Sequence, residues 1–396
     1  MAHTSTVFNQ LLDFLPRYDF ECFVKQYNAD KYTKKLNCWQ QLLCLIYAQA
    51  TGKESLRDIE TSLKVHHQRW YHLGLETVAK STLSDANRSR PHEIFERLFY
   101  EILGRCKNVS VNKPFKFDSP VYLLDGSVIS LCLSLCPWSK YGQTKGGLKI
   151  HNLLSLDRQL PEIIVLAEQK ISELEIAESI DWSRFSDSWL IFDRGYYKYC
   201  WWNSLNQNNI KFVTRLRSGT NYCVLGQLTS AMPENTDGVI KDERIALFGE
   251  AGLEDYPQDL RLITYRDPKT KKVYQFITND FQEVPETIAQ LYKERWQIEL
   301  FFKWIKQNLV IKSFLGTSKN AVLTQIWIAM IYLLLIAYIK HQTGTKLSLL
   351  ELSRVITSAF LSPLTLIDLL NLNPKTATST IARASPRSQL TLCSNL

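Results

Sequence analysis

The 396-residue sequence predicts an α/β fold in which a mixed sheet is flanked by helices, with a helical N-terminal domain and a β-rich insertion. Two near-continuous apolar runs, Val121–Leu124 and Trp189–Phe192, are typical of strands buried on both faces of a sheet. Strand-like and helix-like segments alternate around these runs. An aspartate follows each run directly, so we expect Asp125 and Asp193 to lie where two strands leave the sheet.

The first 115 residues are predicted to be helical. Apolar residues recur near helical spacing in Trp39–Ala50 and again in Ile94–Leu103, where they make an amphipathic helix. Ser55 is the expected N-cap of the helix that follows Gly52. Pro91 marks the break before the second amphipathic helix.

Between these helices lies Ser81–Arg90, a short polar stretch with basic residues on one side. One interpretation is a recognition helix in the major groove of DNA, where side chains reach base edges and phosphates. The alternative is an ordinary solvated helix on the surface. The side chains that would contact DNA under the first interpretation are Asn87, Arg88 and Arg90.

Residues 116–217 are predicted to form three strands, a helix, a strand, a helix and a strand. Asp157–Gln159 is the expected turn between the second and third strands. The expected strands are 121–129, 148–156, 163–167, 189–193 and 211–216, and the expected helices are 173–180 and 196–206.

Residues 218–281 differ in character and predict a β-rich insertion. Apolar runs such as Arg261–Tyr265 and Val273–Ile277 alternate with turns such as Asp267–Lys269. The insertion explains why the next acidic candidate, Glu299, follows Asp193 at such a distance in the sequence.

That candidate lies on a helix predicted to begin near Pro285, a residue favoured in the first turn. On a helical wheel, Tyr292, Arg295, Glu299 and Lys306 fall within an arc of roughly 60°. One face would then carry a carboxylate able to bind a metal, together with two cations and a phenol able to hold phosphates. The simpler alternative is a solvated face on which Glu299 only forms a salt bridge at helical spacing.

Asp125, Asp193 and Glu299 together would make an all-oxygen pocket with three negative charges. Hard divalent cations such as Mg2+ prefer oxygen ligands. Two such ions could stabilise both the attacking and the leaving oxygen of a phosphoryl transfer.

The sequence resembles a known family at these positions. Asp125-Gly126-Ser127, Asp193-Arg194-Gly195-Tyr196 and the Tyr292/Arg295/Glu299/Lys306 set resemble the three catalytic motifs of bacterial insertion-sequence transposases. These are the DDE enzymes with the Y-R-E-K signature and a ribonuclease H-like core. Further similar segments occur in order and extend the resemblance over roughly residues 115–340; they are Lys149-Ile150-His151, Phe212–Leu216 and Thr278–Asp280.

The resemblance implies a ribonuclease H-like sheet and a DNA transposase. Asp125, Asp193 and Glu299 would hold two Mg2+ ions, with Mn2+ as a substitute, and metal-activated water would cleave DNA at the element ends. The freed 3′-OH ends would then join target DNA by cut-and-paste transposition. The residues that would contact transposon-end phosphates are Tyr292, Arg295 and Lys306, with Lys149 as a weaker candidate. His151 is expected to be an ordinary strand residue that makes a normal hydrogen bond.

The implied partner is double-stranded DNA, as terminal inverted repeats and as target. Synapsis of two ends implies self-association, at least as a dimer. The net charge of +8 suits a polyanion without proving one. The nine cysteines include no C-x2-C pair, which favours free thiols in the cytoplasm, where we expect a nucleoid-associated protein.

No membrane association is expected. The stretch Met1–Asn9 is polar and lacks the features of a secretory signal. The uncharged apolar run Ile326–Ile339 is shorter than the ~20 residues of a spanning helix, so we interpret it as a buried core helix. Two alternative functions stay open, namely an inactive or domesticated DNA-binding protein and a metal-dependent nuclease that does not transpose.

The sequence thus predicts five parts. They are a helical, inverted-repeat-binding domain at 1–115, the first part of the core at 116–217, the insertion at 218–281, the second part of the core at 282–345, and a C-terminal helical segment with a flexible polar tail at 346–396.

Overall fold

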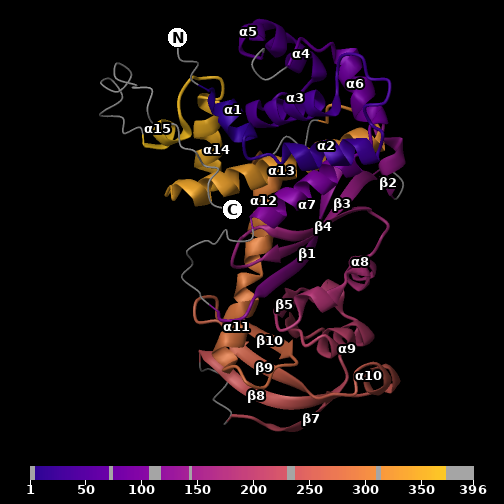
Figure 1. Ribbon diagram of the computed structural model, residues 1–396. Coiled ribbons are helices and arrows are strands. Elements are labelled where there is room, and N and C mark those ends of the chain that lie inside the picture. The colour runs from indigo at the N-terminus through magenta and orange to yellow at the C-terminus, as the bar shows by residue number, and fades with distance from the viewer. Residues whose placement is uncertain are drawn as a thin grey trace. The chain divides into compact units, whose positions relative to one another are not determined.

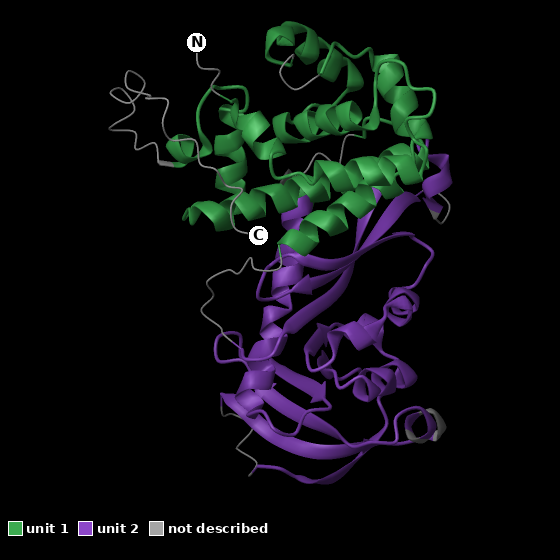
Figure 2. Cartoon of the chain, viewed as in Figure 1, with its two compact units in different colours: residues 1–109, 306–396 green, residues 110–305 purple. Residues whose placement is uncertain are grey.

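The computed structural model describes residues 5–70, 75–106, 117–141, 145–229, 237–308 and 314–371. The chain forms two compact units, which Figure 2 shows in green and purple. The first unit combines Met1–Val109 with Lys306–Leu396, and the second is Ser110–Ile305. The five-part division stays a prediction, and the polar tail predicted for the end of the chain lies outside the described residues.

The described elements of the first unit are all helices, as the sequence predicts for its N-terminal part. Side-chain caps set where several of them begin: Asn37 and Gln40 form a reciprocal capping box, and Ser55 accepts from the backbone N–H of Asp58. The helices are α1 (Val7–Leu12), α2 (Arg17–Gln26), α3 (Cys38–Thr51), α4 (Leu56–Val65), α5 (His67–Trp70), α6 (Lys80–Ser89), α7 (Glu93–Arg105), α13 (Lys319–Thr343), α14 (Leu349–Ser358) and α15 (Leu366–Asn371).

Helix α13 is the core of the first unit. Ser318 caps its start, and Gly344 ends it in the left-handed conformation at φ 60°. With 25 residues it is long and apolar enough to cross a membrane by length and composition alone, but 94% of its most apolar window is buried inside the protein. It packs against α3, α6, α7 and α14. The prediction of a buried core helix is therefore confirmed, although the helix extends well beyond the apolar run.

The second unit is built on one ten-stranded mixed sheet (Figure 1). Its strand order is β2-β3-β1-β5-β6-β10-β9-β8-β7, with β4 paired to β3. The β1–β5 and β5–β6 pairs are parallel and the other pairs are antiparallel. The strands are β1 (Val121–Leu131), β2 (Lys140–Tyr141), β3 (Lys145–Ser155), β4 (Pro161–Glu168), β5 (Trp189–Phe192), β6 (Lys211–Arg215), β7 (Tyr222–Gln227), β8 (Gly238–Leu247), β9 (Leu260–Arg266) and β10 (Val273–Thr278).

An aromatic cluster covers one face of this sheet. Phe192 of β5 and Phe212 of β6 pack against Trp201 and Trp202 of helix α9 (Tyr199–Gln207), with ring centroids 4.9 to 6.3 Å apart. Helix α8 (Glu173–Ser179) contributes to the same cluster.

The predicted insertion does contain strands, but they do not form a separate sheet. Strand β10 pairs with β6 of the core, in the register Ile277↔Thr214, and β9, β8 and β7 follow outward in one ladder. Asp242 of β8 and Arg261 of β9 form a buried bidentate ion pair, with both N–O distances at 2.8 Å. This pair fixes the two strands to each other within the sheet.

The predicted glutamate helix is interrupted. Helix α11 (Pro285–Glu294) begins with a proline as expected, and α12 (Trp296–Asn308) follows after Arg295. Around this point the backbone N–H of Arg295 bonds to the carbonyl of Tyr292, and that of Ile298 bonds to the carbonyl of Arg295. These i→i−3 bonds tighten the turn, so the ideal helical wheel does not hold across residue 295.

Candidate active site

The two predicted aspartates lie side by side where parallel strands β1 and β5 part. The last paired residues are Leu124 and Phe192, and Asp125 and Asp193 come directly after them. Strand β1 continues alongside β3, whereas the chain after β5 turns at once into a short 3-10 helix, Arg194–Tyr196. Asp193 caps that helix, because its Oδ1 accepts from the backbone N–H of Gly195 at 2.7 Å.

The two carboxylates influence each other. Burial, with a contribution from the negative charge of Asp193, raises the pKa of Asp125 to about 7, although the Gly126 backbone N–H and the Arg295 guanidinium lower it. A carboxyl group held in this way is poorly compensated when ionised. The exit of β1 and β5 is therefore a place where a bound cation would be stabilised.

The third predicted acid, Glu299, lies near the same place but is engaged with a cation. Nη2 of Arg295 lies 2.5 Å from Oε1 of Glu299. The Arg295 guanidinium also interacts electrostatically with Asp125, so one cation acts on both the glutamate and the aspartate. The described residues contain no group of three His, Cys, Asp or Glu side chains placed to hold a metal ion.

Tyr292 and Arg295 of the predicted phosphate-binding set come together. The Tyr292 ring packs on Phe276 of β10 at 4.9 Å, and the Arg295 guanidinium lies 5.8 Å from its centroid. Lys306, further along α12, belongs to the first unit, and its position relative to the carboxylates stays a prediction.

One acid at this place is missed by the sequence analysis. Glu173, the first residue of α8, lies against the two glycines that follow the aspartates. A Cβ at Gly126 would lie 3.3 Å from Oε1 of Glu173, and a Cβ at Gly195 would lie 2.8 Å from its Oε2. Burial and the charge of Asp193 raise the pKa of Glu173, and Lys149 lowers it. The sequence places this residue only in an intervening helix, where nothing distinguishes it from Glu175.

The structure contradicts the prediction that Lys149 contacts DNA. Its side chain is buried, its Nζ donates to the carbonyl of Ile171 at 3.0 Å, and it lies 3.9 Å from Oε1 of Glu173. Lys149 is thus turned toward the protein interior beside the acid. His151, expected to make an ordinary hydrogen bond, is buried with neither ring nitrogen bonded.

With this geometry in view, the comparison with known families is decisive. Residues 116–335, more than half of the chain, match the family described as Transposase DDE domain. The chain belongs to the DDE transposase family. A DDE domain has a ribonuclease H-like core, which confirms the predicted fold class. Residues 3–76 match a second family, described as a domain of unknown function, DUF4372.

Individual transposases are similar to this one. The protein assigned as transposase y4zB of Sinorhizobium fredii is 32% identical over 249 residues, which cover 63% of this chain and 68% of that protein. The transposase assigned to insertion sequence element IS5377 of Geobacillus stearothermophilus is 25% identical over 285 residues, 71% of this chain and 74% of that protein.

A solved structure also resembles this transposase. It is a cryo-EM structure of the piggyBac transposase synaptic complex with hairpin DNA, at 12% identity and a TM-score of 0.44, covering 97% of this chain and 85% of that chain. At that TM-score the likeness establishes neither fold nor function. The family match is what identifies a DNA transposase whose DDE domain works with divalent metal ions.

The residues at the β1–β5 exit fit a divalent metal ion in their chemistry. Asp125 and Asp193 offer only oxygen donors, which hard cations prefer. The raised pKa of Asp125 marks a buried carboxyl group whose negative charge is only partly compensated by the Arg295 guanidinium. Glu299 is a further oxygen donor, and Arg295 already engages its Oε1.

In the first unit, the structure overturns two of the three DNA contacts predicted for α6 and the residue that follows it. Asn87 is buried and accepts from Nε2 of Gln41 at 2.9 Å. Arg90 is also buried, donates to Oε1 of Gln41 at 3.0 Å and pairs with Asp30. Both side chains hold the unit together, so neither faces a DNA groove. Arg88 alone is exposed, where it pairs with Asp85 at 2.8 Å.

A groove of about 650 Å³ lies beside α6 in the first unit. Three exposed lysines from the segment before α3 line it, together with Asp85 and Ser89 of α6. Those lysines are Lys31, Lys34 and Lys35.

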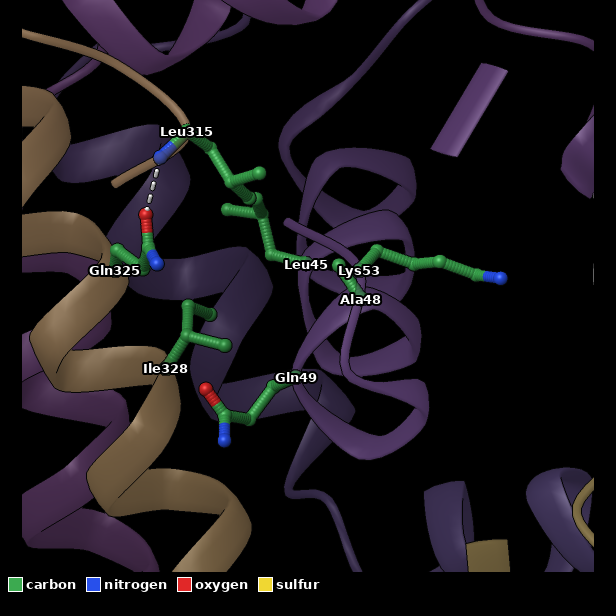
Figure 3. Close-up of a pocket in the computed structure, with 7 residues that line it drawn as sticks. All are labelled: Leu45, Ala48, Gln49, Lys53, Leu315, Gln325 and Ile328. Carbon is green, nitrogen blue, oxygen red and sulfur yellow. Dashed lines mark hydrogen bonds between the residues drawn. The ribbon is translucent and has the colours of Figure 1, made fainter. Parts of the chain in front are cut away.

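A second hollow in this unit, shown in Figure 3, has a volume of only about 10 Å³. Gln49 points into it without a hydrogen-bond partner, and Gln325 accepts from the backbone N–H of Leu315. Its size suits one water molecule and no larger ligand.

Proposed function

We propose that this transposase cleaves DNA at the ends of its element and joins the 3′-OH ends to target DNA, with Asp125, Asp193 and Glu299 holding the metal. The observation that carries the proposal is the adjacency of Asp125 and Asp193 at the parting of β1 and β5. The metal is Mg2+, as two ions, with Mn2+ as a substitute. When bound, these ions activate a water molecule and stabilise the leaving oxygen.

The residues around the carboxylates orient the DNA. The partly buried Arg295 side chain is held by its ion pair with Glu299, and its guanidinium also interacts with Asp125. A DNA phosphate would compete with Glu299 for the guanidinium, because arginine binds phosphate in a bidentate way. That exchange frees Glu299 for the metal. Tyr292 and Lys306 complete the contacts to the phosphates near the scissile bond.

The substrate is the terminal inverted repeat, and the first unit helps to bind it. The lysines of the groove beside α6 and the exposed Arg88 support this, since cationic side chains hold the phosphate backbone. Bringing two ends together requires at least a dimer in the synaptic complex.

A cleavage assay on the element's own end tests the proposal. Purified wild-type protein and the Asp125→Asn and Glu299→Gln variants would be given end DNA with Mg2+, with Mn2+ or with EDTA. We expect metal-dependent nicking at the boundary by the wild type, and binding without nicking by both variants. Unchanged nicking by either variant would remove that residue from the site, and specific binding without nicking by the wild type under any metal would favour a DNA-binding relic.

Transfer of the 3′-OH ends separates a transposase reaction from simple nuclease action. The same DNA, pre-cleaved at the 3′ end, would be offered with a circular plasmid as target. We expect joined products that are absent with Glu299→Gln. Cleavage without any joining would instead favour a nuclease that does not transpose.

A further inference from the structure

A third carboxylate, that of Glu173, lies against two glycines close to the aspartates. Glu173 begins α8, and its side chain extends over the exits of β1 and β5. Oε2 of Glu173 and Oδ1 of Asp193 lie 2.8 and 2.9 Å from one point, the position that a Cβ of residue 195 would take. Oε1 lies 3.3 Å from the corresponding point at Gly126, the neighbour of Asp125. Both glycines therefore leave room for the same carboxylate.

Buried polar groups without partners surround this carboxylate. Tyr196 is fully buried, its hydroxyl has no hydrogen-bond partner, and it lies within electrostatic reach of Glu173, Asp125 and Asp193. His151 is 2% exposed with both ring nitrogens unbonded, and its Nδ1 lies 3.2 Å from the Cβ position of Gly126. Buried polar groups are normally satisfied, so unsatisfied ones around an acidic pocket point to a bound ion with its water.

The simpler explanation is that Glu173 only neutralises Lys149. The distance of 3.9 Å between Lys149 Nζ and Glu173 Oε1 is long for such a pair, and the ammonium already donates to the Ile171 carbonyl at 3.0 Å. A structural pair would not require Glu173 to approach both Gly126 and Gly195. It would also leave the hydroxyl of Tyr196 unexplained.

We propose that Glu173 supplies a carboxylate oxygen to the divalent metal ion that Asp125 and Asp193 hold. The inference rests on the proposed function, because it takes the two aspartates as metal ligands. The three carboxylates would hold the ion, and the buried hydroxyl of Tyr196 would then lie beside a hydrated cation that could satisfy it. Glu173 therefore serves the DNA-free protein, in which Arg295 engages Glu299.

The test measures Mn2+ binding to the full chain without DNA. Binding is monitored as the loss of the free Mn2+ signal in electron paramagnetic resonance. We expect Glu173→Gln and Glu173→Asp to weaken Mn2+ binding at least about tenfold. Glu173→Asp keeps a negative charge opposite Lys149 but shortens the reach, so it protects the fold. Glu175→Gln is the matched control, an exposed acid in the same turn of α8, and should bind as the wild type does.

Asp125→Asn separates the two proposals. If it loses Mn2+ binding while both Glu173 variants bind as the wild type does, Glu173 is not a ligand and the proposed function stands. If Asp125→Asn also binds as the wild type does, the metal site of the proposed function is wrong. Wild-type crystals soaked in Mn2+ need no variant: an anomalous peak about 2.2 Å from the Glu173 carboxylate supports the proposal, and a peak on Asp125 that avoids Glu173 overturns it.

Discussion

Arg295 and Glu299 form an ion pair, with Nη2 of the arginine 2.5 Å from Oε1 of the glutamate, and the guanidinium also lies within electrostatic reach of Asp125 in β1. The pair spans the point at which α11 gives way to α12. Without DNA, the guanidinium thus engages the acid predicted to bind metal. The predictions for metal binding and DNA cleavage depend on whether the Arg295 guanidinium binds Glu299 or a DNA phosphate.

Replacing Arg295 by Gln should change metal binding and DNA cleavage in opposite directions. Loss of the guanidinium removes a positive charge near Asp125, so we expect Mn2+ to bind the DNA-free protein roughly fivefold more tightly, about 1 kcal/mol. Cleavage of end DNA should fall, because a phosphate contact is lost. Mn2+ titration and a nicking assay on the same preparation measure both effects. Equal losses in both assays would mean that Arg295 supports the site structurally.

The raised pKa of Asp125 predicts a characteristic pH dependence of stability. With a folded-state pKa of about 7 against a usual value of 3.8, the metal-free folded protein holds a proton that the unfolded chain has released. The free energy of unfolding should therefore fall as pH rises from about 4 through 7, and this contribution should be missing in Asp125→Asn. Urea unfolding of both proteins in EDTA at pH 5 and pH 8 measures the difference.

His151 is a second titrating group whose effect on stability must be separated from that of Asp125. Burial and the charge of Lys149 lower its pKa to about 4, so its protonation in the unfolded chain makes stability rise with pH up to about 6.5. This opposite slope is present in the wild type and in Asp125→Asn, so it cancels between them. Parallel pH profiles for the two proteins would show that Asp125 ionises normally.

The sequence predicts the acids on strands better than the groups on helices, for a physical reason. An apolar run that ends on an aspartate indicates a buried strand and the place where it leaves its neighbours. Asp193 directly follows β5 as this pattern predicts, whereas Asp125 lies within β1, at the point where its pairing with β5 ends. Glu173 carries no such pattern, because an acid in the first turn of a helix is ordinary. Its significance depends on how α8 crosses the sheet, which is a matter of tertiary packing.

Polar residues on α6 illustrate the converse error. Asn87 and Arg90 have the composition of a DNA-reading face, but they bond to Gln41 of α3, a partner distant in sequence. Periodicity cannot distinguish a polar side chain that faces solvent from one that completes a buried network. The sequence does not predict the helix interruption at Arg295 for a similar reason, because local composition does not indicate the i→i−3 hydrogen bonds found there.

Asn87 and Arg88 should therefore respond differently to alanine. Asn87→Ala leaves the amide of Gln41 without its acceptor, so we expect a loss of about 1–3 kcal/mol in the free energy of unfolding. Arg88→Ala breaks only an exposed pair, so its stability should stay within about 0.5 kcal/mol while end-DNA affinity falls. Urea unfolding and gel-shift titration measure the two quantities. A stable Asn87→Ala with weakened DNA binding would restore the recognition-helix interpretation.

The buried pair of Asp242 and Arg261 should be costly to break on one side. Asp242→Ala leaves the Arg261 charge buried without its partner, so we expect a loss of about 3–5 kcal/mol. Asp259→Ala removes a more exposed and longer pair with Arg244, at 3.7 Å, and should cost less than about 1 kcal/mol. Urea unfolding compares them. Similar losses in both variants would mean that the buried pair gives no special stability.

The inserted strands share one ladder with the strands that carry the acids, from β5 through β6 and β10 out to β7. The insertion is therefore a continuation of the core sheet and not a separately hinged subdomain. Turning it relative to Asp193 would shear the backbone bonds between β6 and β10, in the register from Phe276↔Arg215 to Thr278↔Val213. A molecule bound to the outer strand β7 would be connected to Asp193 strand by strand, through the backbone hydrogen bonds of one sheet.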